Sequence, residues 1–219
     1  MNHAKNKTRA CILIAGLFVF AASLPAQHIT PEEAMRRDLA EYSVEELVEA
    51  IRSFPPHDSQ FLELSVMVIQ QIGEKGQGSE VARQQLQNTL QQGMDRVARI
   101  NNREIDYWRV RAESALALGR IGDREATPNL IRAAMNDKDI MVQMCAIRAL
   151  GMLGDPAAVP RLMDMLENTT IDRVANEIVF ALGEIGDRRA LPILLATTQR
   201  NFSASVHRRA REAMRKLQD

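Results

Sequence analysis

Matching residues recur every 32 positions in the second half of the chain, and this fixed period constrains the fold more than any other feature. Valine, alanine and leucine columns return in register without an insertion, and methionine replaces leucine in the last copy. About 20–50 residues is the period typical of stacked-repeat proteins. The sequence therefore predicts a stacked array. The columns are Val110, Val142, Val174 and Val206; Ala117, Ala149, Ala181 and Ala213; and Leu118, Leu150, Leu182 and Met214.

Each period is predicted to hold two helices. Positions 110, 114, 117, 118 and 121 fall on one face of a helix, and across the copies that face is apolar or small. A Gly-x-Ile/Leu-Gly-Asp turn follows, in which the second glycine can take the left-handed conformation that ends a helix. The aspartate can cap a second helix, expected from about Arg124 to Met135. The turns span residues 119–123, 151–155 and 183–187.

These residues resemble the HEAT repeat family, in its short bacterial form with phycobilisome-lyase-like repeats, over about residues 107–219. The shared pattern is the valine-initiated helix, the Ala-Leu-Gly-x-Ile-Gly-Asp turn and the following Ala-x-Pro-x-Leu helix. The resemblance implies an all-α fold, an α-solenoid of antiparallel helix pairs with the first helix of each pair on the concave side. It also implies protein binding more often than catalysis, because the matching residues are packing residues.

The first half of the mature chain is predicted to be helical but irregular. Thr30 with Glu33, and Ser43 with Glu46, form two capping boxes. A helix is expected from about residue 58 to Gly73, and a long polar helix from Ser79 towards Ile100. We interpret these residues as degenerate repeats that shield the end of the array from water. The predicted domains are a signal peptide (1–26), a helical cap (27–105) and the HEAT-like array (106–219).

Residues 1–26 have the layout of a signal peptide. Lys5, Lys7 and Arg9 precede an apolar run from Cys11 to Ala22, and small residues follow it. The run is shorter than the roughly 20 residues that span a bilayer. We expect cleavage after Ala26 and export, in the first place to the bacterial periplasm. Secretion, or a membrane anchor if the segment is retained, are the alternatives.

Charge is balanced overall but not along the chain. The 28 basic and 28 acidic residues give a formal net charge of zero, which argues against binding to nucleic acid. Residues 32–63 are acidic, whereas the last helix is basic. The basic helix is interpreted as a solvated cap, a site for an anionic partner, or one half of a head-to-tail contact between copies.

A search for catalytic motifs is negative. The sequence has no HExxH, P-loop, GxGxxG, GxSxG or Cys-x-x-Cys motif. Cys145 is interpreted as a small hydrophobe on a helix, with a redox or catalytic thiol as the alternative. We therefore expect no catalytic residues, no cofactor, no metal ion and no enzymatic activity.

A ridge of positions that face away from the packed columns is the predicted binding surface. Large apolar groups recur there beside an arginine, a composition typical of interface cores. The alternatives are that N-terminal helices cover this ridge, or that scattered exposed apolar residues have no role. The predicted partner-binding residues are Trp108, Leu116, Met144, Arg148, Phe180, Arg208 and Arg211.

The predicted function is that of an exported, non-catalytic scaffold that binds another protein through the concave face of the array. One alternative is an enzyme subunit or lyase-like protein that uses the array to bind its substrate. The other is a membrane-tethered structural protein, if residues 1–26 are not removed.

Overall fold

The computed structural model describes residues 30–54, 60–95, 98–100, 103–105 and 107–218. The signal peptide predicted for residues 1–26 lies outside them. Within the described ranges, no helix has both the length and the hydropathy that crossing a membrane requires.

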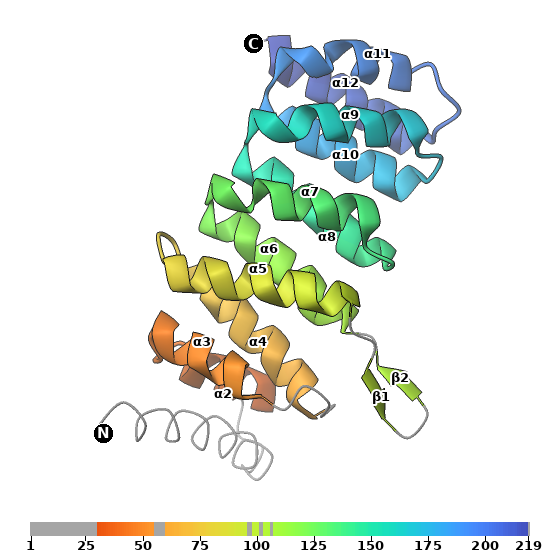
Figure 1. Cartoon of the computed structure of the whole chain (residues 1–219). Helices are drawn as coiled ribbons and strands as arrows, with labels where there is room; N and C mark the ends of the chain where they lie inside the picture. The colour runs from red at the N-terminus through yellow and green to blue at the C-terminus, as the bar shows by residue number, and fades with distance from the viewer. Residues whose placement is uncertain (1–29, 55–59, 96–97, 101–102, 106, 219) are drawn as a thin grey trace, which may run out of the picture.

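Antiparallel helices stack in two layers along the molecule, with the N-terminal helices at one end and α12 at the other (Figure 1). Two short helices, α2 (Pro31–Leu39) and α3 (Val44–Ser53), lie at the N-terminal end. The inner layer consists of α4 (Gln60–Lys75), α6 (Trp108–Ile121), α8 (Ile140–Leu153), α10 (Asp172–Ile185) and α12 (Ala204–Gln218). The outer layer consists of α5 (Glu80–Asp95), α7 (Thr127–Asn136), α9 (Val159–Asn168) and α11 (Leu191–Thr197).

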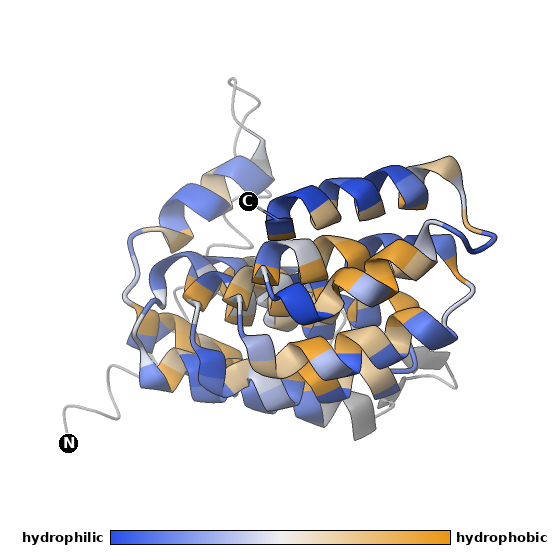
Figure 2. Ribbon diagram, turned by 90° about the horizontal axis from the view of Figure 1, so that it is seen from above, coloured by the Kyte–Doolittle hydropathy of each residue, from blue (hydrophilic) through white to orange (hydrophobic). Residues whose placement is uncertain are grey.

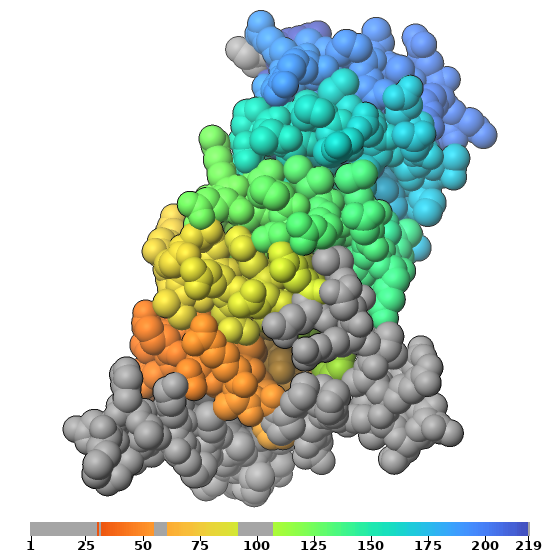
Figure 3. Space-filling view, viewed as in Figure 1, coloured from red at the N-terminus to blue at the C-terminus, as the bar shows by residue number. Residues whose placement is uncertain are grey.

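The outer helices form one continuous surface, on which each helix lies beside the next (Figure 3). Successive inner helices nevertheless share many more contacts than successive outer helices do. A stack whose helices approach each other more closely on one side curves towards that side. The inner layer is therefore expected to line the concave side, which the family resemblance implies for the first helix of each pair.

Local sequence signals account for the ends of the helices. Thr30 and Ser43 form the two predicted capping boxes. In the repeats, Gly122, Gly154 and Gly186 end α6, α8 and α10 in the left-handed conformation, with φ values of 78°, 58° and 77°. The aspartate after each glycine caps a short 3₁₀ turn that precedes α7, α9 and α11. The predicted turn is confirmed, with this 3₁₀ turn as an added step.

The first glycine of each turn is the point at which neighbouring inner helices touch. A Cβ atom at Gly119 would lie 2.9 Å from the Cα atom of Ala149, and one at Gly151 would lie 2.9 Å from the Cα atom of Ala181. Only a residue without a side chain fits at this distance. The predicted ridge of positions that face away from the packed columns was taken to include Gly119, Gly151 and Gly183; this is wrong, because these glycines are buried between helices.

The same contact extends the repeat register into the N-terminal half. A Cβ atom at Gly73 of α4 would lie 2.8 Å from the Cβ atom of Ala117, so Gly73 corresponds to Gly119 and not to Gly122. The offset between Gly73 and Gly119 is 46 residues, 14 more than the regular period. The longer outer helix α5 and a hairpin after it occupy the additional length. This insertion hid the register from the sequence search.

The prediction of one long helix from Ser79 towards Ile100 is wrong. Helix α5 ends at Asp95, and two short strands follow, β1 (Ala98–Ile100) and β2 (Arg103–Ile105). They pair antiparallel, with Ala98 opposite Ile105 and Ile100 opposite Arg103. Each strand ends in a β-branched isoleucine, a residue type enriched in strands. Likewise α4 runs to Lys75 and does not stop at Gly73, and its predicted start lies outside the described residues.

The N-terminal helices and the array share one hydrophobic core. Ion pairs also cross between them. Arg109 of α6 pairs with Glu63 of α4. Arg83 of α5, whose side chain is 11% exposed, pairs with Asp123 at 2.7 Å and with Glu125, both in the first repeat turn. Near residue 105 an irregular, longer repeat is followed by regular 32-residue repeats. That this position is also a domain boundary stays a prediction.

A buried ion pair connects α6 to the loop between α7 and α8. The Nε and Nη2 atoms of Arg111 donate to the two carboxylate oxygens of Asp137 at 2.9 and 3.0 Å, and both side chains are fully buried. Asp137 also accepts from the backbone N–H of Asp139, and its carbonyl accepts from Gln143. No repeat signal marks this pair in the sequence, because the positions that correspond to Arg111 are occupied by Gln143, Ala175 and His207.

Candidate binding face on the inner helices

One stripe of each inner helix faces neither the outer layer nor the neighbouring inner helices, and in the repeats all of its residues but the buried Glu177 are partly or fully exposed. We call the stripes together the inner face. In the repeats its residues are Arg109, Glu113, Leu116 and Arg120; Met141, Cys145, Arg148 and Met152; Arg173, Glu177, Phe180 and Glu184; and Ser205, Arg209, Glu212 and Lys216.

The middle of the inner face holds an ion pair between successive helices. Arg148 of α8 donates to both carboxylate oxygens of Glu177 of α10, at 3.1 and 2.7 Å. The Glu177 side chain is 10% exposed, whereas that of Arg148 is 52% exposed. This bidentate bond to Glu177 raises the pKa of Arg148. Arg148 was predicted as a binding residue, but its structural partner Glu177 was missed.

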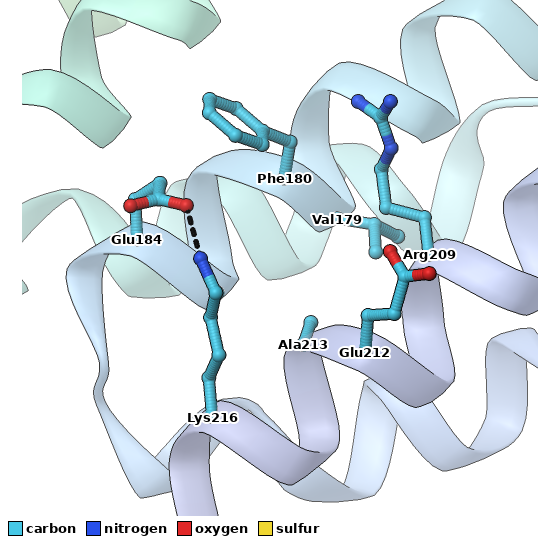
Figure 4. Close-up of a pocket in the computed structure, with 8 residues that line it drawn as sticks. Val179, Phe180, Glu184, Arg209, Glu212, Ala213 and Lys216 are labelled. Carbon is cyan, nitrogen blue, oxygen red and sulfur yellow. Dashed lines mark hydrogen bonds and ion pairs between the residues drawn. The ribbon is translucent and has the colours of Figure 1, made fainter.

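An open groove lies between α10 and α12, with a cavity volume of about 230 Å³ (Figure 4). Val179, Phe180, Gly183 and Ala213 supply its apolar lining. The guanidinium carbon of Arg209 lies 5.7 Å from the centroid of the Phe180 ring, within the range of a cation–π contact. A pair between Lys216 and Glu184, at 2.5 Å, bridges the two helices beside this cavity, as Figure 4 shows. The groove can therefore hold an apolar group between charged side chains.

The stripe of α8 is rich in sulfur. Met141 and Met152 are 39% and 44% exposed, and Cys145 lies half-buried between them. Methionine side chains adapt to different partners because they are flexible and polarisable. Burial, with Glu113 as the next cause, raises the pKa of the Cys145 thiol to about 11. The thiol is therefore protonated at neutral pH, which fits the interpretation as a small hydrophobe better than that as a reactive nucleophile.

The structure separates the predicted binding residues into three groups. Leu116, Arg148 and Phe180 lie on the inner face. Trp108 and Met144 are half-buried and pack against the hydrophobic core, so less of each is available to a partner. The last group, Arg208 and Arg211, lies on α12 outside the inner face. The positions correspond to those of Ala112 and Ala115 in α6, which are buried on the side of α6 that faces α8. Partner binding by any of these residues stays a prediction.

Neither Leu116 nor Phe180 is among the described side chains that pack against the buried core. Both are half-exposed, on α6 and α10 respectively. The alternative that N-terminal helices cover this surface does not fit residues 30–54, because α2 and α3 contact α4 and α5 at the end of the stack. In the described part of the chain, no group of three His, Cys, Asp or Glu side chains is placed to hold a metal ion.

Comparisons with known proteins agree with this architecture. A family model of HEAT repeats matches residues 103–183, and a model of the PBS lyase HEAT-like repeat matches residues 174–199. The comparison with curated proteins found no match.

Among solved structures, a chain in the complex of CpcE and CpcF of phycocyanin lyase from Nostoc sp. PCC7120 is similar to this chain, and the match covers 90% of this chain. The match covers 70% of that chain, with 23% sequence identity and a TM-score of 0.62, and it shows the shared fold. Human deoxyhypusine hydroxylase in complex with glycerol matches over the whole chain at 16% identity, but a TM-score of 0.38 is too low to support an argument.

These matches correct the expectation that the chain is not an enzyme. That expectation is wrong. It rested on the absence of catalytic motifs, whereas the repeats of the PBS lyase type and the fold shared with a chain of a lyase complex point towards lyases. A motif search detects sites carried by one short segment, whereas a repeat array assembles its surface from side chains on several helices. The all-α fold class is confirmed, and so is the resemblance to the HEAT repeat family with repeats of the phycobilisome-lyase type, which the family models match over residues 103–183 and 174–199.

Proposed function

We propose that this chain is a lyase-like HEAT protein that binds the protein on which it acts, or a second enzyme subunit, on its inner face. The match to the PBS lyase HEAT-like repeat supports the lyase-like part. The likeness to a complex of two lyase chains supports a protein partner. The single observation that carries the proposal is the inner face itself, an exposed surface of apolar and charged side chains on successive inner helices.

The composition of the inner face favours a protein over a small molecule. Leu116, Phe180 and Met152 supply apolar surface on three helices, and Arg148 lies between them. Protein interfaces combine apolar anchors, methionine and arginine in this way. The groove beside Phe180, with a cavity volume of about 230 Å³, can hold one apolar side chain of a partner.

We also propose that residues 1–26 direct the protein out of the cytoplasm, so that its substrate is an envelope or secreted protein. The basic start, the short apolar run and the small residues before Gln27 support this proposal. N-terminal sequencing of the protein recovered from the envelope fraction should begin at Gln27. A start at Met1 in that fraction would instead indicate a retained anchor.

The proposed function is tested by photo-cross-linking from two positions in living cells. A photoreactive residue at position 152 reports on the inner face, and one at position 195 of α11 reports on the outer layer; the native Met152 and Leu195 are 44% and 54% exposed. We expect a protein to be captured from position 152 and not from position 195. The double change Leu116→Ser with Phe180→Ser should abolish this capture with little loss of thermal stability, since neither side chain packs in the core.

The matched control is Met135→Ser with Leu195→Ser, two exposed apolar residues of the outer layer, which should leave capture unchanged. The lyase-like part is tested on the captured protein, whose mass is compared between cells with and without this chain. We expect a mass difference that marks a covalent modification. Equal masses would contradict a lyase-like function, and capture from position 195 alone would contradict the inner face as the binding site.

A further inference from the structure

One exposed side of α12 carries a row of arginines. The other inner helices carry packing residues at the corresponding positions. In α6, α8 and α10 this row faces the next inner helix: Gly119, Gly151 and Gly183 touch alanines of the following helix, and Asn176 donates to Ser205 of α12. Residues four and seven positions earlier share the same side of the helix. The internal rows are Ala112, Ala115 and Gly119; Met144, Ile147 and Gly151; and Asn176, Val179 and Gly183. In α12 the row is Arg208, Arg211 and Arg215.

All three arginines are exposed, and within the described residues none of them forms an ion pair. By contrast, Lys216 on the adjacent inner face pairs with Glu184. Helix α12 holds five basic residues and one acidic residue, a net charge of +4. Figure 2 shows it as a largely hydrophilic helix that ends at the C-terminus.

A polar cap alone does not account for this row. The end of an array must be polar, but mixed charges serve this purpose equally well. Like charges three and four residues apart on a helix repel each other and lower its stability. An oppositely charged partner would convert that repulsion into attraction.

The opposite end of the molecule has the opposite charge. Residues 30–54, which form α2 and α3, contain seven acidic and three basic residues, a net charge of −4. Figure 1 places these helices and α12 at the two ends of the stack. Glu41 and Glu45 are exposed at the acidic end, and neither forms an ion pair within the described residues.

We propose that the arginine row of α12 binds the acidic helices α2 and α3 of a second copy of this chain, in a head-to-tail contact. The two surfaces differ, so the contact is heterologous, and a third copy can add to either free end. Attraction between exposed charges is screened by salt, with a Debye length of about 10 Å at 0.1 M. The association is therefore expected at low ionic strength and lost at high ionic strength.

Sedimentation velocity on the protein, isolated after expression of the full chain, tests this proposal. At 20 mM salt the weight-average mass should rise with protein concentration to at least twice the monomer mass, and at 500 mM salt it should stay at that of the monomer. The tail variant Arg208→Glu, Arg211→Glu and Arg215→Glu should stay monomeric at both salt concentrations. The matched control Arg124→Glu, Arg132→Glu and Arg161→Glu changes the net charge equally at other exposed positions and should still associate. Thermal melting confirms that each variant is folded.

A mixing experiment identifies the occupant of the arginine row. The head variant Glu41→Gln with Glu45→Gln should also be monomeric alone. Mixed in equal amounts, the head and tail variants should form a complex of two chains and nothing larger, because each retains one intact end. A mixture that stays monomeric would overturn the proposal, as would association that persists in the tail variant. Binding of an acidic peptide by a chain that never self-associates would show that the row serves another acidic protein.

Discussion

Replacing Asp137 with asparagine is expected to lower the free energy of unfolding by about 3–5 kcal/mol, because it takes the Asp137 carboxylate away from the buried guanidinium of Arg111. Both side chains are fully buried and joined by two hydrogen bonds. The carboxylate of Asp137 also accepts from the backbone N–H of Asp139 at the start of α8, so the loss should also affect the connection between α7 and α8. Urea unfolding followed by circular dichroism measures it.

Two further variants show whether the charge is responsible. Asp164→Asn removes an exposed carboxylate that pairs with Arg161 on α9, and it should change stability by less than about 0.5 kcal/mol. The double variant Arg111→Met with Asp137→Asn removes both buried charges and should recover much of the loss. If Asp137→Asn and Asp164→Asn had equal effects, the pair would have no special role in the core.

Replacing Ala149 with leucine is expected to cost about 1–3 kcal/mol, towards the upper end of that range. Ala149 is fully buried, and its Cα atom lies 2.9 Å from the place where a Cβ atom of Gly119 would be. A larger side chain meets the backbone of α6, which cannot move aside as a flexible side chain would. The inner helices must then separate, and contacts on both sides of α8 are weakened.

The control for this variant is Ala157→Leu, in the exposed turn between α8 and α9. It adds the same atoms where there is solvent, and its unfolding midpoint in urea should match that of the unchanged protein. A midpoint for Ala149→Leu that also matches would show that the inner helices do not approach each other at this position. The assignment of Gly119 and Ala149 to one contact would then be wrong.

The sequence predicted part of the candidate site. Leu116, Arg148 and Phe180 were identified because the 32-residue period fixes which side of each helix points away from the packed columns. Glu177 was missed, since it makes its bond to a residue 29 positions earlier on another helix. The groove beside Phe180 was missed for the same reason, as it exists only where α10 and α12 lie together.

The sequence by itself determined the features that depend on neighbours along the chain. These are the two helices in each period, the capping boxes of α2 and α3, and the left-handed glycines at 122, 154 and 186. Each follows from backbone geometry and hydrogen bonding within a few residues.

Only the tertiary structure decided the features that depend on distance in space. It assigned Gly73 to the position of Gly119 across a 14-residue insertion, buried the Arg111–Asp137 pair, and placed Arg208 and Arg211 at the end of the array. A residue on an inner helix has one chemical identity but three possible surroundings: the outer layer, the next helix or solvent. Which of these it meets is set by the stacking of helices that are about 30 or more residues apart in the chain.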